Sequence, residues 1–203
     1  MTSTARAGRP GATVGSGSTP TPSPSPLTCE VPTAGGTVQV RPILPDDEDR
    51  LRQFHAQLSS RSVYLRYFFL HPELSEAEVH RLTHVDTVDR LALVATDRGR
   101  IVAVGRYDRL PGTGQAEVAF VVADEFQHQG IGTRLLAMLA DAAVGNGISV
   151  LVAEALATNG GMIDMLLHSG FPLTSLRHDG TVQVRLLVGS GPPGATHDTV
   201  LGV

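Results

Sequence analysis

A short stretch near the middle of the chain, residues 127–133, reads Gln-His-Gln-Gly-Ile-Gly-Thr and has the composition of a phosphate-binding turn. Its two glycines, Gly130 and Gly132, allow backbone conformations closed to other residues, so successive N–H groups can point at one anion. A helical pattern begins directly after the turn, and the N-terminus of a helix attracts negative charge. The spacing predicts an anion site, and a strand-to-helix turn without a ligand is the alternative that this segment alone leaves open.

The strand expected before this turn, residues 115–123, carries Glu117 as its only charged residue. A carboxylate in a buried strand must meet a partner, become neutral or face a cleft, because burial of an unpaired charge is costly. Side chains alternate between the two faces of a strand, so Glu117 shares a face with Ala119 and Val121. These residues leave room beside the acid, which therefore stands next to open space near the predicted anion site.

Two motifs, in this order and at this separation, resemble those of one enzyme family. The first, Gln127-x-x-Gly130-x-Gly132, matches the acetyl-CoA pyrophosphate motif of the GCN5-related N-acetyltransferases, which reads Gln/Arg-x-x-Gly-x-Gly/Ala. The second spans residues 159–171, begins Asn-Gly-Gly-Met and ends Gly-Phe, and is similar to the later helix of that family. The resemblance implies acetyl-CoA as co-substrate, no metal, and transfer of an acetyl group to an amine.

The resemblance also implies which residues contact the cofactor. Main-chain groups around Val121 and Ala123 would pair with the pantetheine arm, the Val121 N–H would stabilise the developing oxyanion, and Asn159 would add a polar contact. The pyrophosphate would be held by the backbone of the turn, that is, by Gln127, Gln129, Gly130, Ile131, Gly132 and Thr133.

In the resembled family, the position of Glu117 is that of the general base. Apolar surroundings in the strand should raise the pKa of Glu117 towards the range useful for base catalysis at neutral pH. The alternative is a structural salt bridge from Glu117 to Arg106 or Arg109.

One position departs from the family pattern. Many relatives carry a tyrosine seven residues after the asparagine, where it can protonate the leaving thiolate, but this chain has Leu166 there. We expect His168 to point elsewhere, because two residues along a helix changes the face. Water, or no acid at all, is therefore expected in place of the tyrosine.

Two histidines, His80 and His84, stand four apart on an expected helix, which is the spacing of paired metal ligands. No third ligand is evident from the sequence, so we expect ordinary helix histidines and no metal site. His128 within the turn could neutralise phosphate when protonated, although an incidental role is the simpler interpretation.

Composition limits the partners of the chain. The formal net charge of −4 and the lack of a basic face argue against nucleic acid, and no apolar run has the length of a membrane span. Cys29 is the only cysteine, so no intrachain disulfide can form. We expect a cytoplasmic enzyme of unknown oligomeric state.

Three segments are expected. Residues 1–36 are rich in Gly, Ser, Thr and Pro and should be disordered, and residues 191–203 should form a flexible C-terminal tail. Residues 37–190 should form one catalytic domain. Its strand and helix signals, including a capping box at Ser75 and Glu78 and a hairpin turn at residues 97–100, predict an α/β fold. This order is the one expected of the family, a mixed and mostly antiparallel sheet with helices on both faces.

The acceptor is the least determined feature. Residues 58–69 are similar to bacterial protein lysine acetyltransferases that modify acyl-CoA synthetases, so a protein lysine is the expected acceptor and such a synthetase the expected partner. Two alternatives stay open: an acetyltransferase for a small amine, and a non-catalytic module that binds acyl-CoA and regulates a partner.

Overall fold

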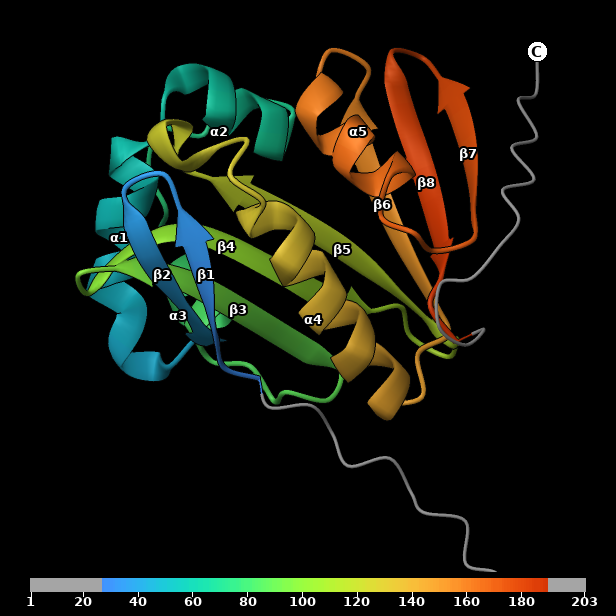
Figure 1. The fold of residues 1–203 in the computed structure, drawn as a ribbon, viewed down its shortest axis with the longest axis horizontal. Coiled ribbons are helices and arrows are strands. Elements are labelled where there is room, and N and C mark those ends of the chain that lie inside the picture. The colour runs from blue at the N-terminus through green and yellow to red at the C-terminus, as the bar shows by residue number, and fades with distance from the viewer. Residues whose placement is uncertain (1–26, 190–203) are drawn as a thin grey trace, which may run out of the picture.

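An eight-stranded sheet carries the fold in the computed structural model, which describes residues 27–189 (Figure 1). The strand order is β1-β2-β3-β4-β5-β6-β8-β7, and only β5 and β6 pair in parallel. The mixed, mostly antiparallel sheet that the sequence predicts is thereby confirmed. The strands are β1 (Cys29–Thr33), β2 (Gly36–Pro42), β3 (Arg90–Asp97), β4 (Arg100–Arg109), β5 (Gln115–Val122), β6 (Val150–Leu156), β7 (Leu173–His178) and β8 (Thr181–Leu187).

Helices cover both faces of the sheet, as predicted. On one face α4 (Ile131–Gly145) packs Leu135 and Leu139 against Val118 and Phe120 of β5. On the other face lie α1 (Glu48–Gln57), α2 (Ser60–Tyr67) and α3 (Glu76–Thr83). The remaining helix, α5 (Gly160–Leu167), stands beside β6 and β8 (Figure 1). Apolar side chains at helical spacing explain these positions, because each helix buries its apolar stripe against the sheet.

Local sequence signals fix several boundaries. Ser75 and Glu78 form the predicted capping box, and α3 begins at Glu76. The β3–β4 hairpin turns through Arg98 and Gly99, both in the left-handed conformation at φ 47° and 82°. Glycine adopts this conformation without a steric penalty, which is why the turn is readable from the sequence.

Two strands lie where none was predicted. The expectation that residues 1–36 form one disordered tail is wrong for its last part, because Cys29–Thr33 form β1 and pair antiparallel with β2. The buried side chain of Val31 explains this order, since pairing with β2 places it in the main core. The second unpredicted strand, β7, is a largely exposed edge strand with little apolar alternation. The rest of both predicted tails lies outside the described residues.

The site is positioned by the way β5 and β6 separate. Their parallel pairing covers only Gln115 to Glu117 of β5, opposite Val150 to Val152 of β6. Both strands continue beyond this pairing, β5 to Val122 and β6 to Leu156. The backbone groups of β5 that face β6 therefore have no partner strand over the second half of β5.

Within residues 27–189, no helix is long and apolar enough to cross a bilayer.

Candidate active site

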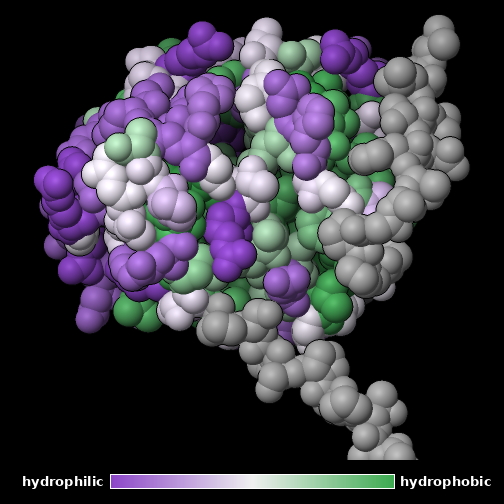
Figure 2. Space-filling view, viewed as in Figure 1, coloured by the Kyte–Doolittle hydropathy of each residue, from purple (hydrophilic) through white to green (hydrophobic). Residues whose placement is uncertain are grey.

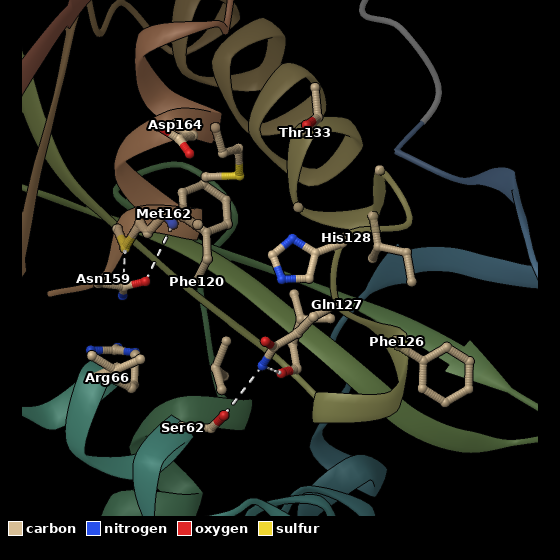
Figure 3. A pocket seen from close by; sticks show the side chains of 18 residues that line it. Ser62, Arg66, Phe120, Phe126, Gln127, His128, Thr133, Asn159, Met162 and Asp164 are labelled. Atoms are coloured by element: carbon tan, nitrogen blue, oxygen red, sulfur yellow. Dashed lines mark hydrogen bonds between the residues drawn. The ribbon is translucent and has the colours of Figure 1, made fainter.

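A cavity of about 460 Å³ opens where β5 and β6 diverge. Its walls come from the end of β5, the turn before α4, the first turn of α4, and helices α5 and α2 (Figure 3). The space-filling view shows the surface hollowed between α2 and α5 (Figure 2). The lining residues are Ser62, Leu65, Arg66, Phe120, Val121, Val122, Phe126, Gln127, His128, Gly130, Ile131, Gly132, Thr133, Asn159, Gly161, Met162, Asp164 and Met165.

The turn that the sequence marks as an anion site forms one end of this cavity. His128 and Gly130 both adopt the left-handed conformation, with φ of 58° and 80°, and α4 begins directly afterwards at Ile131. Gly130 is the N-cap residue, and within residues 27–189 no side chain caps the helix. The first N–H groups of α4 therefore have no side-chain acceptor, and the residues that carry them line the cavity. This arrangement can bind an anion through backbone amides and the helix dipole.

The glutamine side chains of the turn hold its shape. Gln127 donates from Nε2 to the Ser62 hydroxyl (3.2 Å) and to the Val122 carbonyl (3.0 Å) (Figure 3). Gln129 donates to the Glu125 carbonyl (2.8 Å) and accepts from the Ala34 N–H (3.0 Å). Of the residues predicted to bind cofactor, Gln129 and Ala123 do not line the cavity, whereas Val121, Gln127, Gly130, Ile131, Gly132, Thr133 and Asn159 do.

The free amides of β5 differ from those that the sequence suggested. The Ala123 N–H donates to the Val102 carbonyl on β4 (2.8 Å), so the prediction that it pairs with a pantetheine arm is wrong for this group. Bonds alternate along an antiparallel ladder, so Val121, which lies opposite Val104, also directs its N–H to β4. The backbone groups of Phe120 and Val122 therefore face the open edge. The bond from Gln127 to the Val122 carbonyl agrees with this direction.

Glu117 lies on the same face of β5 as Ala119 and Val121, as the strand period requires. Burial of this face increases along the strand, from the exposed Glu117 to the half-buried Ala119 and Val121. The expectation of apolar surroundings for Glu117 is therefore wrong, because the helices cover only the later residues of this face. Glu117 itself is not among the residues that line the cavity.

The alternative salt bridge is not formed. Arg106 pairs with Asp108 (2.8 Å) and Arg109 pairs with Asp89 (2.5 Å). Among the described residues, no ion pair involves Glu117. Its exposed carboxylate therefore has no ion-pair partner within residues 27–189.

Asp124, which the sequence did not single out, holds two elements of the site together. Its carboxylate accepts hydrogen bonds from the Ser59 hydroxyl (2.8 Å) and the Ser62 hydroxyl (3.0 Å), and so ties the start of α2 to the segment before the anion turn. Partial burial opposes ionisation, but the hydrogen bonds from Ser59 and Ser62 outweigh it and lower the pKa of Asp124. These contacts join residues far apart in the chain, so the sequence does not predict them. Its one local feature is the pair of serines, Ser59 and Ser62, at the start of a helix.

On the opposite wall, Asn159 is the N-cap of α5 and its Oδ1 accepts a hydrogen bond from the Met162 N–H (3.3 Å). Leu166 is fully buried in the main core and contributes nothing to the cavity. His168 is exposed, contacts the Asp164 carbonyl (2.9 Å) and does not line the cavity. The α5 wall therefore brings no hydroxyl group to the site.

The histidine pair lies apart from this cavity, on the surface of α3. His80 and His84 stack with ring centroids 3.7 Å apart, and Glu48 of α1 approaches both, 3.3 Å from His80 Nδ1 and 3.8 Å from His84 Nδ1. Glu48 is the third potential metal ligand that the sequence did not reveal. Its carboxylate also lies 3.7 Å from Arg52, so Glu48 already has a cationic neighbour at the surface.

Comparison with known proteins agrees with this geometry. Residues 54–171 match the sequence profile of the acetyltransferase (GNAT) family. The chain is 31% identical over 141 residues to acetyltransferase PA5475 of Pseudomonas aeruginosa, covering 68% of this chain and 76% of that protein. It is 32% identical over 123 residues to acetyltransferase Pat of Mycolicibacterium smegmatis, covering 59% of this chain and 37% of that longer protein.

Among solved structures, the GNAT domain of S. lividans PAT superposes with a TM-score of 0.74 at 38% identity. The match covers 79% of this chain and 97% of that domain. The diverging strands, the uncapped helix N-terminus and the matching profile thus agree with one another. The chain belongs to the GNAT family of acetyltransferases and is an acyl-CoA-dependent N-acyltransferase.

Proposed function

We propose that this protein transfers the acetyl group of acetyl-CoA to the side-chain amine of a lysine in a protein, with Glu117 as general base. The observation that carries the proposal is the cavity between β5, α4 and α5, which ends at the uncapped N-terminus of α4. This shape suits an extended thioester whose diphosphate needs backbone donors at one end. A cytoplasmic location remains a prediction from composition.

The residues present fit acetyl-CoA along the length of the cavity. Its diphosphate would accept hydrogen bonds from the N–H groups of Ile131, Gly132 and Thr133. Its pantetheine arm would lie along the open edge of β5, where Phe120 and Val122 direct their backbone groups. An N–H on this edge can donate to the thioester oxygen as that oxygen becomes negative, which lowers the barrier to attack.

Glu117 would act from the acceptor side of the same strand. A lysine amine is protonated at neutral pH and must lose a proton before it can attack. The exposed and unpaired carboxylate of Glu117 can accept that proton, directly or through one water molecule. Its exposure, on the face of β5 that Ala119 and Val121 share, supports this role, because an amine from solvent can reach it.

A protein acceptor is favoured by exposed apolar side chains on α2, which forms one wall of the cavity, and in the loop after it. Tyr64, Phe69 and Leu70 are 45%, 57% and 77% exposed. Exposed apolar side chains on such a segment suit a large partner, which can bury them, better than a small amine. The similarity of residues 58–69 to protein lysine acetyltransferases acting on acyl-CoA synthetases points to such a synthetase as the partner class.

Two measurements on the full chain test this proposal. Calorimetric titration with acetyl-CoA should show binding, and incubation with labelled acetyl-CoA should label folded acyl-CoA synthetases on lysine. Labelling of small amines alone would reject the protein acceptor. Binding without labelling of any amine would identify a non-catalytic module, and no affinity for any acyl-CoA would reject the cofactor assignment.

A further inference from the structure

Arg66 occupies the wall of the cavity opposite β5. It belongs to the last turn of α2, and the large cavity and a smaller one beneath α1 share only Arg66 and Val121 as lining residues. Its guanidinium lies on the side of the cavity where Asn159 stands, away from Thr133 at the anion turn (Figure 3). Arg66 is thus placed beside the β5 segment where the thioester is proposed to lie, and away from the proposed diphosphate site.

The guanidinium of Arg66 has no anionic partner within the described part of the chain. No hydrogen bond or ion pair joins it to residues 27–189. Its Cζ atom lies over the ring of Tyr67, 5.1 Å from the ring centroid. The charged groups that act on it electrostatically include Arg106 and Asp108 of β4 and Glu117 of β5. Asp108 is already bound by Arg106 and by Arg90 (3.0 Å), so it is not available as a full counter-charge.

The surroundings of Arg66 therefore leave its charge incompletely balanced. Burial lowers the pKa of Arg66, although Tyr67, Glu117 and Asp108 act in the opposite direction. Among the residues that line the large cavity, Arg66 is the one lysine or arginine. A half-buried cation without a partner is costly, and an anion that forms beside it would be stabilised more strongly than in water.

We propose that Arg66 binds the thiolate that leaves during acetyl transfer. This inference rests on the proposed function. Glu117 takes the proton that the lysine ammonium must lose, and the neutral nitrogen attacks the thioester carbonyl carbon. The new C–N bond forms, and the second proton on this nitrogen passes to solvent. The C–S bond breaks and its electron pair remains on sulfur. Arg66 donates an N–H hydrogen bond to this sulfur, and the thiolate takes a proton from solvent when the product leaves.

Arg66 would stabilise the leaving sulfur at a site where α5 offers no hydroxyl group to protonate it. Leu166 is buried in the core, so the position that carries a tyrosine in many relatives offers no hydroxyl to the sulfur. A guanidinium stabilises the thiolate as an ion instead of protonating it, because arginine keeps its proton at all ordinary pH. The predicted consequence is a bound thiol that ionises more readily than free coenzyme A.

The test compares binding of coenzyme A with binding of dethio-coenzyme A, which lacks the sulfhydryl group, by calorimetry from about pH 7.5 to about 9.5. The charged and titratable groups near Arg66 or in the same cavity are Arg106, Asp108, Glu117, His128 and Asp164. Dethio-coenzyme A meets the same groups, so the affinity ratio cancels every pH effect that does not act on the sulfur. In the wild type, the affinity ratio of the two ligands should rise with pH. The rise should approach about tenfold for each unit by which Arg66 lowers the thiol pKa.

In Arg66→Gln and Arg66→Met the ratio should no longer rise over this range, and kcat should fall about 10- to 100-fold. Arg66→Lys should keep part of the rise, because it keeps the charge. Arg61→Gln, which removes an exposed arginine from the same helix, should leave the ratio unchanged.

An equal rise in the wild type and both neutral variants would overturn the inference. So would loss of dethio-coenzyme A binding in both variants, which would show that Arg66 only shapes the cavity. A raised KM for the amine with an unchanged ratio would assign Arg66 to the acceptor. Failure of the wild type to bind either coenzyme A or dethio-coenzyme A would instead reject the proposed function itself.

Discussion

Gly132 of α4 faces Met165 of α5 so closely that a β-carbon on Gly132 would stand 2.8 Å from the Met165 Sδ. Both residues line the cavity. This contact favours a small residue at position 132, because α4 and α5 form adjoining walls of the cavity.

Gly132→Ala should weaken acetyl-CoA binding several-fold with little effect on stability. Alanine is a better helix former than glycine by about 1 kcal/mol, which offsets much of the cost of displacing the flexible Met165 side chain. The displaced side chain takes space from the cavity, and calorimetry with thermal unfolding separates the two effects. Gly132→Ala with Met165→Ala should recover affinity, and a single variant that binds as tightly as the wild type would contradict the explanation.

Gly130→Ala should also lower cofactor affinity, but for a different reason. No atom lies within 4 Å of a β-carbon built on Gly130, so the substitution causes no clash. Its φ of 80° is the difficulty, because a left-handed conformation costs a non-glycine residue about 1–2 kcal/mol. If the backbone relaxes this strain, the N–H groups at the start of α4 would no longer converge on one anion.

Gly145→Ala is the matched control for Gly130→Ala. Gly145 ends the same helix, has no neighbour within 4 Å and does not adopt a positive φ. Alanine there should raise the melting temperature, because it favours the helix by up to about 1 kcal/mol. Equal losses of affinity in both variants would show that the conformation of Gly130 is unimportant.

Glu117→Gln should lower kcat by about 10²–10⁴-fold without changing the affinity for acetyl-CoA. Glutamine keeps the shape of the side chain but cannot accept the proton, and Glu117 does not line the cofactor cavity. Turnover of the variant should rise with pH, since a higher fraction of the acceptor amine is then already deprotonated. Glu154→Gln, at an exposed position on β6, is the control. Wild-type turnover across this pH range would remove Glu117 from the mechanism.

Asp47 should stabilise the protein in a pH-dependent way. Its buried carboxylate accepts hydrogen bonds from Arg41 (2.6 and 2.8 Å), Arg50 (2.9 Å) and the Leu44 N–H (2.9 Å). Burial alone would raise the pKa, but these donors outweigh it and hold the pKa at about 2, against an ordinary 3.8. A lowered folded-state pKa stabilises fully above about pH 4, and this contribution is lost as the pH falls towards 2.

Asp47→Asn should therefore lower the free energy of unfolding by roughly 2 kcal/mol near neutral pH and by less at about pH 3. Urea denaturation at both pH values measures the difference. Asp49→Asn is the control, because Asp49 is exposed and pairs with Arg52 at the surface. If the loss for Asp47→Asn is the same at both pH values, ionisation of Asp47 is not its cause.

Much of the site was predictable because its signals are local. Gly130 needs a left-handed conformation within one turn, and Asn159 caps the helix that follows it in sequence. The face shared by Glu117, Ala119 and Val121 follows from the strand period alone. The strand β1 was missed because its short apolar alternation stands beside a Gly- and Pro-rich segment, and only pairing with β2 makes it a strand.

The amino-acid sequence by itself determined the turn before α4, the acid in the strand and the order of the helices and of every strand except β1 and β7, since each depends on neighbours a few residues apart. Tertiary structure alone decided that Glu117 is exposed, that the Ala123 N–H donates to β4, and that Arg66 faces the cavity without an ion-pair partner in the described part of the chain. These properties depend on which distant segments the fold brings together. Burial and hydrogen-bond partnership are set by packing, and packing is not encoded in any single stretch of the chain.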